Sequence, residues 1–135
     1  MKGVLLIVTA MILAFSVACG NYGTDDSREA GVKTVTEHAV VAWVTSGPQG
    51  LHDFLSIAAQ ADCLTSKLEP AFAQEPKPSA WKETKDISFP SDVEAQATVV
   101  FESGGQEIEQ QWSLALENYS WRISRMPGVE NCATS

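Results

Sequence analysis

Three cysteines are the residues of this chain whose surroundings point most directly to a chemistry. Cys19 follows an apolar stretch near the N-terminus, whereas Cys63 and Cys132 lie in the part of the chain that is patterned as a folded domain. An even pair of cysteines in an exported chain predicts a disulfide. A bridge between them would close a loop of roughly 70 residues and contribute about 4 kcal/mol in the chain-entropy model. The alternative is two unpaired thiols.

The N-terminus has the pattern of a signal peptide. Lys2 is followed by apolar runs as far as Phe15, small residues come next, and no further charge occurs before Asp25. This order predicts a leader over residues 1–18. Because a helix needs about 20 residues to cross the hydrocarbon core of a membrane, we expect this short leader to be removed.

The residues around the expected cleavage site resemble a bacterial lipobox. Ser16 and Ala18 place small side chains before Cys19, although a lipobox usually carries Leu where Ser16 stands. The resemblance implies that Cys19 becomes a lipidated first residue and holds the protein on the extracytoplasmic face of the cell membrane. A secreted form cut by an ordinary signal peptidase and an uncleaved anchor are the alternatives.

The next segment, residues 19–32, is expected to be a flexible tether between the anchor and a single domain over residues 33–135. Its residues 20–29 include one aromatic and no aliphatic side chain, so they have little surface to bury. The chain as a whole has 17 acidic and 9 basic residues and a net charge of −8. Nucleic acid is therefore not an expected partner, because it attracts basic faces.

The first half of the domain has a helical pattern. Thr34 and Glu37 fit a capping box, and Gly47 with Pro48 should end the helix that it begins. The apolar positions of this helix recur at spacings of three and four residues; they are Val35, Ala39, Val40, Trp43 and Val44. A second helix is expected to hold Leu51, Phe54, Leu55 and Ala58, and a short third turn to hold Cys63, Leu64 and Leu68 before Pro70.

The second half has the alternation of an antiparallel sheet, after a proline-rich connection at residues 76–79. Residues 93–101 alternate with period two, with Val93, Ala95, Ala97, Val99 and Phe101 on the core face. Gly104 and Gly105 mark a hairpin turn, and the return strand should turn Ile108, Gln110, Trp112, Leu114 and Leu116 inward. A turn at residues 117–119 should lead into a last strand, with Trp121, Ile123 and Arg125 in phase, and a short earlier strand is expected at residues 87–89.

Helices followed by a strand meander predict an α+β fold, with N-terminal helices packed on a curved antiparallel sheet. The segments VEAQATVVFES, QEIEQQWSLALEN and YSWRISRM, in this order after the helices, resemble the nuclear-transport-factor-2-like superfamily of cystatin-like rolls. Its members include ketosteroid isomerase and many small actinobacterial lipoproteins. The last segment is similar to the closing G-x-W-x-I of the lipoprotein members, with residues 118–120 in place of their glycine-containing turn. The resemblance covers residues 33–127 and implies a roll that encloses a pocket.

Four side chains are candidates to line such a pocket: Trp43, Gln110, Trp112 and Arg125. Gln110 shares a face with apolar neighbours, so it either lines a pocket or lies at the end of the sheet. Arg125 would meet an anionic ligand or the end of the chain. The tryptophans are also expected to fill the core, because aromatic side chains bury large areas.

An isomerase-like pocket needs a carboxylate to move a proton and a donor to hold an oxyanion. Asp53 and Asp62 are the candidate bases, although solvated or capping roles suit both. Tyr22 lies in the tether and Tyr119 in a turn, so neither is well placed as the donor. His38 and His52 lie apart in the sequence and have no paired Cys motif nearby, so neither a metal nor another cofactor is expected.

These features favour a non-enzymatic lipoprotein of the cell envelope that binds a protein partner or a small apolar ligand in its roll. The alternative is a small isomerase-like or hydratase-like enzyme with an Asp base, and a third possibility is a spacer or assembly factor. The convex face of the sheet is expected to be polar, which favours a monomer or a weak dimer. Its residues are Glu94, Gln96, Thr98, Val100, Glu109, Gln111, Ser113 and Ala115.

Overall fold

The computed structural model describes residues 25–132. The expected leader, Cys19, the first part of the tether and residues 133–135 lie outside this range. The elements are, in chain order, α2 (Asp25–Ser46), the 3-10 helix η1 (Pro48–Phe54), α3 (Ile57–Asp62), α4 (Thr65–Ala71), β1 (Ala80–Ser91), β2 (Glu94–Ser103), β3 (Gln106–Glu117), β4 (Ser120–Arg125) and α5 (Val129–Cys132).

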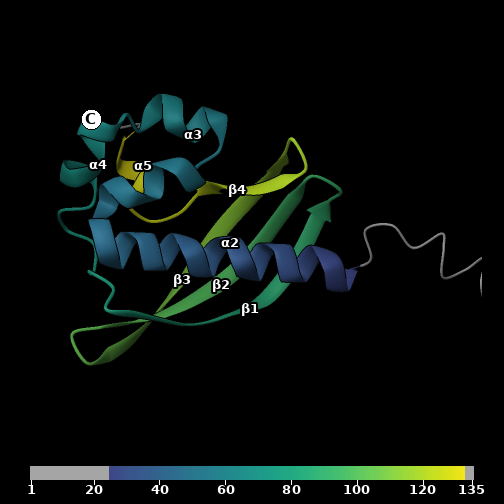
Figure 1. Cartoon of the computed structure of the whole chain (residues 1–135), viewed down its shortest axis with the longest axis horizontal. Coiled ribbons are helices and arrows are strands. Elements are labelled where there is room, and N and C mark those ends of the chain that lie inside the picture. The colour runs from purple at the N-terminus through teal and green to yellow at the C-terminus, as the bar shows by residue number, and fades with distance from the viewer. Residues whose placement is uncertain (1–24, 133–135) are drawn as a thin grey trace, which may run out of the picture.

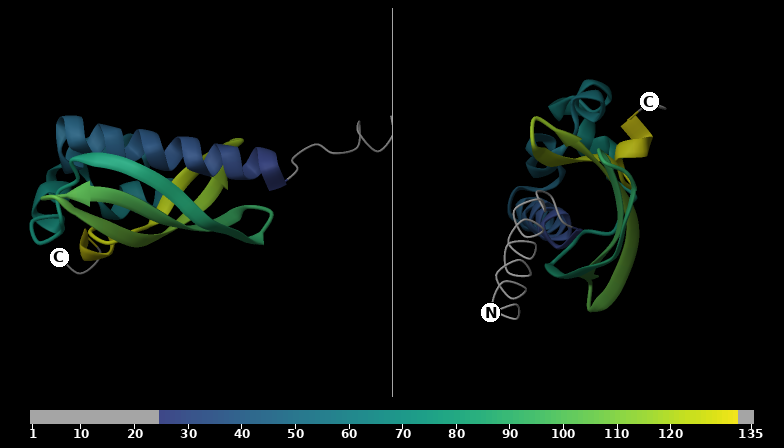
Figure 2. Two further views of the ribbon diagram at one scale, coloured as in Figure 1. Left: turned by 90° about the horizontal axis from the view of Figure 1, so that it is seen from below. Right: turned by 90° about the vertical axis from the view of Figure 1, so that its right-hand side faces the viewer.

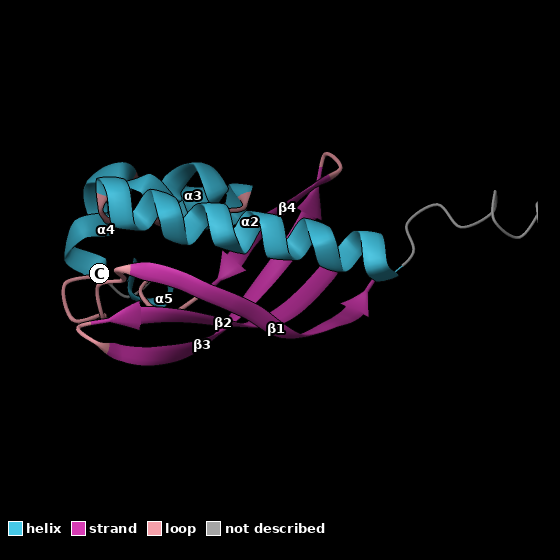
Figure 3. Cartoon of the chain, turned by 60° about the horizontal axis from the view of Figure 1, so that its bottom comes forward, coloured by secondary structure: helices cyan, strands magenta, loops and turns pink. Residues whose placement is uncertain are grey.

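The fold is α+β, as predicted, with N-terminal helices packed on a curved antiparallel sheet in a roll-like arrangement. The four strands lie in the order β1-β2-β3-β4, so each pairs with the next along the chain. The sheet curves around α2, which lies in its concave side, and α2, α3 and α4 lie on one side of the strands (Figures 1, 2 and 3). The sheet does not close into a barrel.

The long helix α2 begins earlier than the sequence indicates. It starts at Asp25, so residues 25–32 are helical and the prediction of a flexible tether is wrong for them. Val32 is fully buried, and a Cβ on Gly31 would lie 2.9 Å from the Trp121 ring. Packing against the sheet therefore stabilises the helical residues 25–32, although their composition alone predicts disorder.

The predicted capping box at the start of this helix is also wrong. The Thr34 hydroxyl donates to the carbonyl of Ala30 at 2.9 Å, one turn back inside α2. A threonine in a helix interior often bonds to the preceding turn in this way, so its side chain marks no helix start here. The predicted end is confirmed, because Gly47 has φ +76° and Pro48 begins η1.

The predicted second helix is broken in two at Leu55 and Ser56. Leu55 forms a parallel bridge with Ile123, and the Ser56 amide donates to the Ile123 carbonyl at 2.8 Å. The Ser56 hydroxyl then accepts from the Ala59 amide and begins α3. The break lets this segment pair with the outer edge of β4, which would otherwise expose unpaired backbone groups.

The concave side of the sheet is filled by side chains. The inward positions predicted on β2 and β3 are confirmed from Ala95 onward, while Val93 is 54% exposed because it lies in the turn before β2. Small residues on β2 stand opposite large ones on β3, as in the Ala97–Trp112 pair. The largest fully buried side chains are Trp112, Phe101, Leu51, Leu55, Leu68, Leu114, Ile123 and Met126. Within residues 25–132, no buried side-chain nitrogen or oxygen lacks a hydrogen-bond partner.

Two residues of the convex face, Thr98 and Val100, are buried, which the sequence did not predict. They lie on β2, where Thr98 pairs with Lys85 of β1 and Val100 pairs with Glu109 of β3. Lys85 and Glu109 form an ion pair that links β1 to β3, with Lys85 Nζ 2.6 Å from Glu109 Oε1. Gln111 also donates to the Thr98 hydroxyl at 2.7 Å. The hydrogen bond and the negative charge of Glu109 raise the pKa of Lys85 above its ordinary value of 10.5. Polar side chains of β1 and β3, the strands on either side of β2, thus cover the middle of the convex face.

The predicted disulfide is confirmed. Cys63, directly after α3, and Cys132, in α5, are joined by an S–S bond of 2.02 Å and are both buried. The bond ties the last helix to the helices near the end of α2 (Figure 1). None of the helices in residues 25–132 is both long enough and apolar enough to cross a membrane.

Candidate functional site

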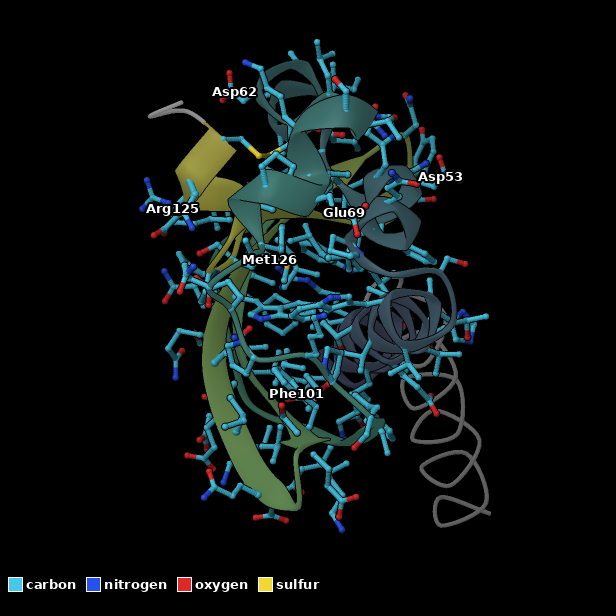
Figure 4. All side chains as sticks on the ribbon, turned by 90° about the vertical axis from the view of Figure 1, so that its left-hand side faces the viewer. Asp53, Asp62, Glu69, Phe101, Arg125 and Met126 are labelled. Atoms are coloured by element: carbon cyan, nitrogen blue, oxygen red, sulfur yellow. A yellow bond between two sulfur atoms is a disulfide. The ribbon has the colours of Figure 1, made fainter. Side chains whose placement is uncertain are left out.

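An apolar groove of about 440 Å³ opens at the end of the roll where α2 ends. It lies between the last turn of α2, the start of η1, α4 and the connection to β1. Its apolar wall consists of Trp43, Val44, Pro48, Phe72 and Pro78, and its polar lining consists of Glu69, Glu75 and Lys77. Figure 4 views the molecule from this end, with Glu69 labelled on α4.

The wall of the groove is built on a rigid aromatic contact. Trp43 meets Phe72 edge to face, with ring centroids 5.3 Å apart, and meets Phe101 of the sheet in the same way at 5.5 Å. Phe72 lies against Gly128, where a Cβ would lie 2.5 Å from its ring. Such aromatic pairs contribute about 0.5–1.5 kcal/mol each beyond their buried area. The wall is therefore part of the hydrophobic core.

The exposed part of the wall comes from α2. Val44 is 42% exposed although it borders the groove, and Val41, one turn earlier on the same helix, is 52% exposed. The rim carries charges of both signs: Glu69 and Glu75 are negative and Lys77 is positive. An apolar centre with a polar rim is the composition of a binding surface. The residues that line the groove include the carboxylates of Glu69 and Glu75 but no cysteine, serine or histidine.

Of the four predicted pocket residues, only Trp43 lines this groove. Gln110 and Trp112 lie on the concave face of the sheet, with 7% and 1% of their surface exposed. The Trp112 indole N–H donates to Gln110 Oε1 at 3.0 Å. Gln110 therefore has a protein partner inside the core, which explains a polar side chain in an apolar row.

Arg125 does not share the inward face of Trp121 and Ile123, so this part of the prediction is wrong. Ile123 pairs with Leu114 but Arg125 pairs with Ser113, so Ser124 is an extra residue in a bulge. Arg125 is exposed and lies 3.5 Å from Glu130, while Met126 takes the buried position.

The two candidate bases lie on the outside of the roll, whereas Phe101 and Met126 lie on the concave side of the sheet (Figure 4). The Asp53 side chain is 97% exposed, with its carboxylate 3.8 Å from His52. Asp62 is exposed at a second, shallow groove of about 490 Å³, which Arg125 also lines. The expectation of an Asp base inside the roll is therefore wrong for both residues. His38 is exposed on α2.

The structure brings together groove residues that the sequence did not single out, above all Phe72 and Pro78. They come from the end of α4 and from the proline-rich connection, where no periodic pattern places a side chain. No signal in the sequence indicated the groove, because the helical pattern placed Val44 on the apolar face with Trp43, whereas the structure leaves it 42% exposed. Within residues 25–132, no three His, Cys, Asp or Glu side chains lie close enough together to hold a metal ion.

Comparison with known proteins finds no family model that matches the chain and no curated protein that is similar to it. Function is therefore inferred from the geometry of the chain itself.

Proposed function

We propose that this protein is an exported, lipid-anchored domain of the cell envelope that binds a protein partner in the groove at the end of α2, without catalysis. We also propose that it belongs to the small lipoprotein branch of the nuclear-transport-factor-2-like superfamily. The α+β roll, with helices before a strand meander, supports that assignment.

Export is supported by two independent features. Residues 1–18 have the pattern of a leader, and Cys63 and Cys132 form a disulfide in the folded domain. Structural disulfides persist in oxidising compartments and are rare in the cytosol. With these two cysteines paired, Cys19 is the remaining thiol and is the expected point of lipid attachment.

The observation that carries the binding proposal is an open apolar groove beside a filled roll. The concave face, which encloses ligands in many rolls, is occupied here by Phe101, Trp112 and Leu114. The groove is an open surface, with Val44 exposed at its edge and charges of both signs around it. An apolar side chain or short segment of a partner protein fits such a surface better than a ligand that must be enclosed.

The position of the groove also suits a tethered binding domain. Helix α2 has 22 residues and is therefore about 33 Å long. The groove lies at its C-terminal end, far from Asp25, where the chain enters the domain. A partner approaching the groove would not have to pass the anchored end. We propose that the domain acts as a monomer or a weak dimer.

The binding proposal is tested with two variants on the same helix. Val44→Glu places a carboxylate in the groove, whereas Val41→Glu adds the same charge at an exposed position outside its lining. A partner cross-linked in the cell envelope should be recovered with the wild type and Val41→Glu and lost with Val44→Glu, and direct binding of the purified partner should follow the same order. If all three proteins bind it equally, the groove is not the binding site.

The anchoring proposal is tested separately by the intact mass of the protein from membrane and culture fractions. We expect a membrane-bound form that begins at Cys19 and carries a diacylglyceride, and a Cys19→Ala variant that leaves the membrane. An unlipidated wild-type chain in the medium would contradict the anchoring proposal and show that the protein is secreted.

A further inference from the structure

The end of the roll opposite the groove carries the tips of two hairpins beside the start of α2 (Figures 1 and 2). One turn holds Asp92 and Val93, and the other holds Asn118 and Tyr119. The two turns are neighbours, because the Leu116 amide donates to the Val93 carbonyl at 2.9 Å. A shallow hollow of about 500 Å³ lies among them, lined by Ser27, Arg28, Gly31, Asp92, Leu116, Tyr119 and Trp121.

Tyr119 is unusual for a residue that serves only the fold. Its side chain is fully exposed, at 100% of its reference surface, and its backbone has φ +64°. A residue with a Cβ in this left-handed region costs about 1–2 kcal/mol. Glycine would avoid the strain in a two-residue hairpin turn. A strained and fully exposed aromatic residue therefore points to a role outside the folded domain.

The expected anchor would keep this end of the domain close to lipid. Cys19 precedes Asp25 by six residues, which span at most about 20 Å when fully extended. A lipid on Cys19 would therefore hold the start of α2 and the two neighbouring turns within that distance of the bilayer surface. Tyrosine is enriched at membrane interfaces, where its ring is apolar and its hydroxyl remains hydrated. Val93, 54% exposed on the adjacent turn, would add apolar surface beside it.

The charges at this end favour a neutral lipid surface. Asp26 and Asp92 are exposed there. The Arg28 guanidinium lies over the Phe89 ring at 3.9 Å and donates to the Ser91 carbonyl at 2.9 Å, so its charge is turned toward the sheet. Anionic head groups attract basic segments and would be repelled by the exposed carboxylates.

We propose that this end of the roll docks on the bilayer surface, with Tyr119 in the head-group region and Val93 beside it. The inference rests on the proposed anchor at Cys19. Docking would direct α2 away from the membrane and present the groove on the distal end of the domain. The contact is aromatic and apolar and lies beside the exposed carboxylates of Asp26 and Asp92, so it should weaken when neutral lipids are replaced by anionic ones.

The test supplies the anchor chemically, so that it does not depend on lipidation in the cell. The processed chain, residues 19–135, is coupled through the Cys19 thiol to a maleimide lipid in phosphatidylcholine vesicles. In this chain Tyr119→Trp is the reporter, and Leu64→Trp, at an exposed apolar position beside α4, is the matched control. Brominated phosphatidylcholine then quenches only indoles that reach the bilayer.

We expect brominated lipid to quench a clearly larger fraction of the emission of the Tyr119→Trp protein than of the anchored wild type. The wild type carries only the four native tryptophans and reports their quenching. The Leu64→Trp protein should show no additional quenching. Replacing part of the phosphatidylcholine by phosphatidylglycerol should reduce the quenching of the Tyr119→Trp protein.

Equal quenching of the two variants, or none in either, would overturn the docking proposal while leaving the anchor untouched. Stronger quenching on anionic vesicles would also overturn it, because the contact would then be electrostatic. The anchor proposal has its own test, the intact mass of the native protein, and an unlipidated Cys19 in that measurement would contradict it.

Discussion

The hydroxyl oxygens of Thr36 on α2 and Thr84 on β1 lie 2.6 Å apart in the core, between the helix and the edge of the sheet. Thr36 donates to the Val32 carbonyl at 2.9 Å, so Thr84 is the donor of the bond between the two hydroxyls. Thr84 in turn accepts from the Trp81 indole N–H at 3.2 Å. This chain of hydrogen bonds satisfies polar groups that would be costly to bury alone and fixes how α2 lies against β1.

The first prediction concerns this pair of threonines. Thr36→Val keeps the shape of the side chain but leaves the Thr84 hydroxyl without its acceptor, so we expect a loss of about 1–3 kcal/mol in the free energy of unfolding. Thr84→Val should have a similar effect. The double variant should lose clearly less than the sum, because neither hydroxyl then remains unpaired. Urea denaturation of the four proteins measures this coupling, and strict additivity would show that the bond is energetically unimportant.

The sheet was the part of the fold that the sequence predicted best. Strands β2 and β3 alternate between the two faces, apart from the buried Thr98 and Val100, and are joined by Gly104 and Gly105, with φ of +58° and +82°. Their register follows from that turn and from the burial of one face. The disulfide was predictable for a different reason, since Cys63 and Cys132 are an even pair once Cys19 is set apart.

The remaining parts depend on contacts that leave no periodic signal. Strand β1 is longer than predicted, because three irregularities in its pairing with β2, one of them at Asp86 with φ +52°, interrupt its alternation. Arg125 was placed on the wrong face because the sequence does not reveal the bulge at Ser124. The groove was missed because Phe72 reaches Trp43 only through tertiary packing.

The second prediction concerns the disulfide. Replacing both cysteines in a Cys63→Ala, Cys132→Ala variant should lower the free energy of unfolding by about 2–4 kcal/mol, mainly because the unfolded chain gains freedom. Differential scanning calorimetry at neutral pH measures the change. Wild type under reducing conditions serves as the control and should melt close to the variant. A variant that melts with the oxidised wild type would show that the bridge adds no stability.

The third prediction concerns Gly128, which supports the wall of the groove. Gly128 has φ +95°, and a Cβ there would lie 2.5 Å from the Phe72 ring. Gly128→Ala should therefore add an overpacking cost to backbone strain and lose about 2–4 kcal/mol. Gly104→Ala is the matched control, because φ is +58° there but nothing lies within 4 Å of the new methyl group. Equal losses in the two variants, measured by urea denaturation, would mean that Phe72 moves aside freely.

The fourth prediction concerns the ion pair between Lys85 and Glu109. Because the pKa of Lys85 is raised in the folded state by its hydrogen bond to Glu109, the folded state holds this proton more tightly than the unfolded chain does. The resulting stabilisation is fully present below the ordinary pKa of 10.5 and is lost as the pH rises through the higher folded value. Between neutral and alkaline pH, the stability advantage of the wild type over Lys85→Gln should therefore shrink as the pH rises above 10.5.

Thermal melting of both proteins from neutral to strongly alkaline pH measures this difference. Lys33→Gln, on the exposed side of α2, removes the same charge away from the sheet and should show no comparable change in this range. A wild-type advantage that stays constant to the highest pH would contradict a raised pKa at Lys85.

The last prediction separates the two properties of Tyr119. Tyr119→Gly should raise the free energy of unfolding by roughly 0.5–1 kcal/mol, because glycine relieves the positive φ of this turn while making the unfolded chain slightly more flexible. The same variant has no aromatic ring to enter a head-group region. When it is anchored through Cys19, its turn should therefore be more readily cleaved by an added protease on vesicles than that of the wild type, despite its higher stability in solution. Asn118→Gly is the control, because Asn118 already tolerates its φ of +49° and the tyrosine ring is kept. If Tyr119→Gly instead lowers the stability of the free domain, the ring makes contacts that stabilise the fold, and its strained position gives no reason to assign it to a membrane.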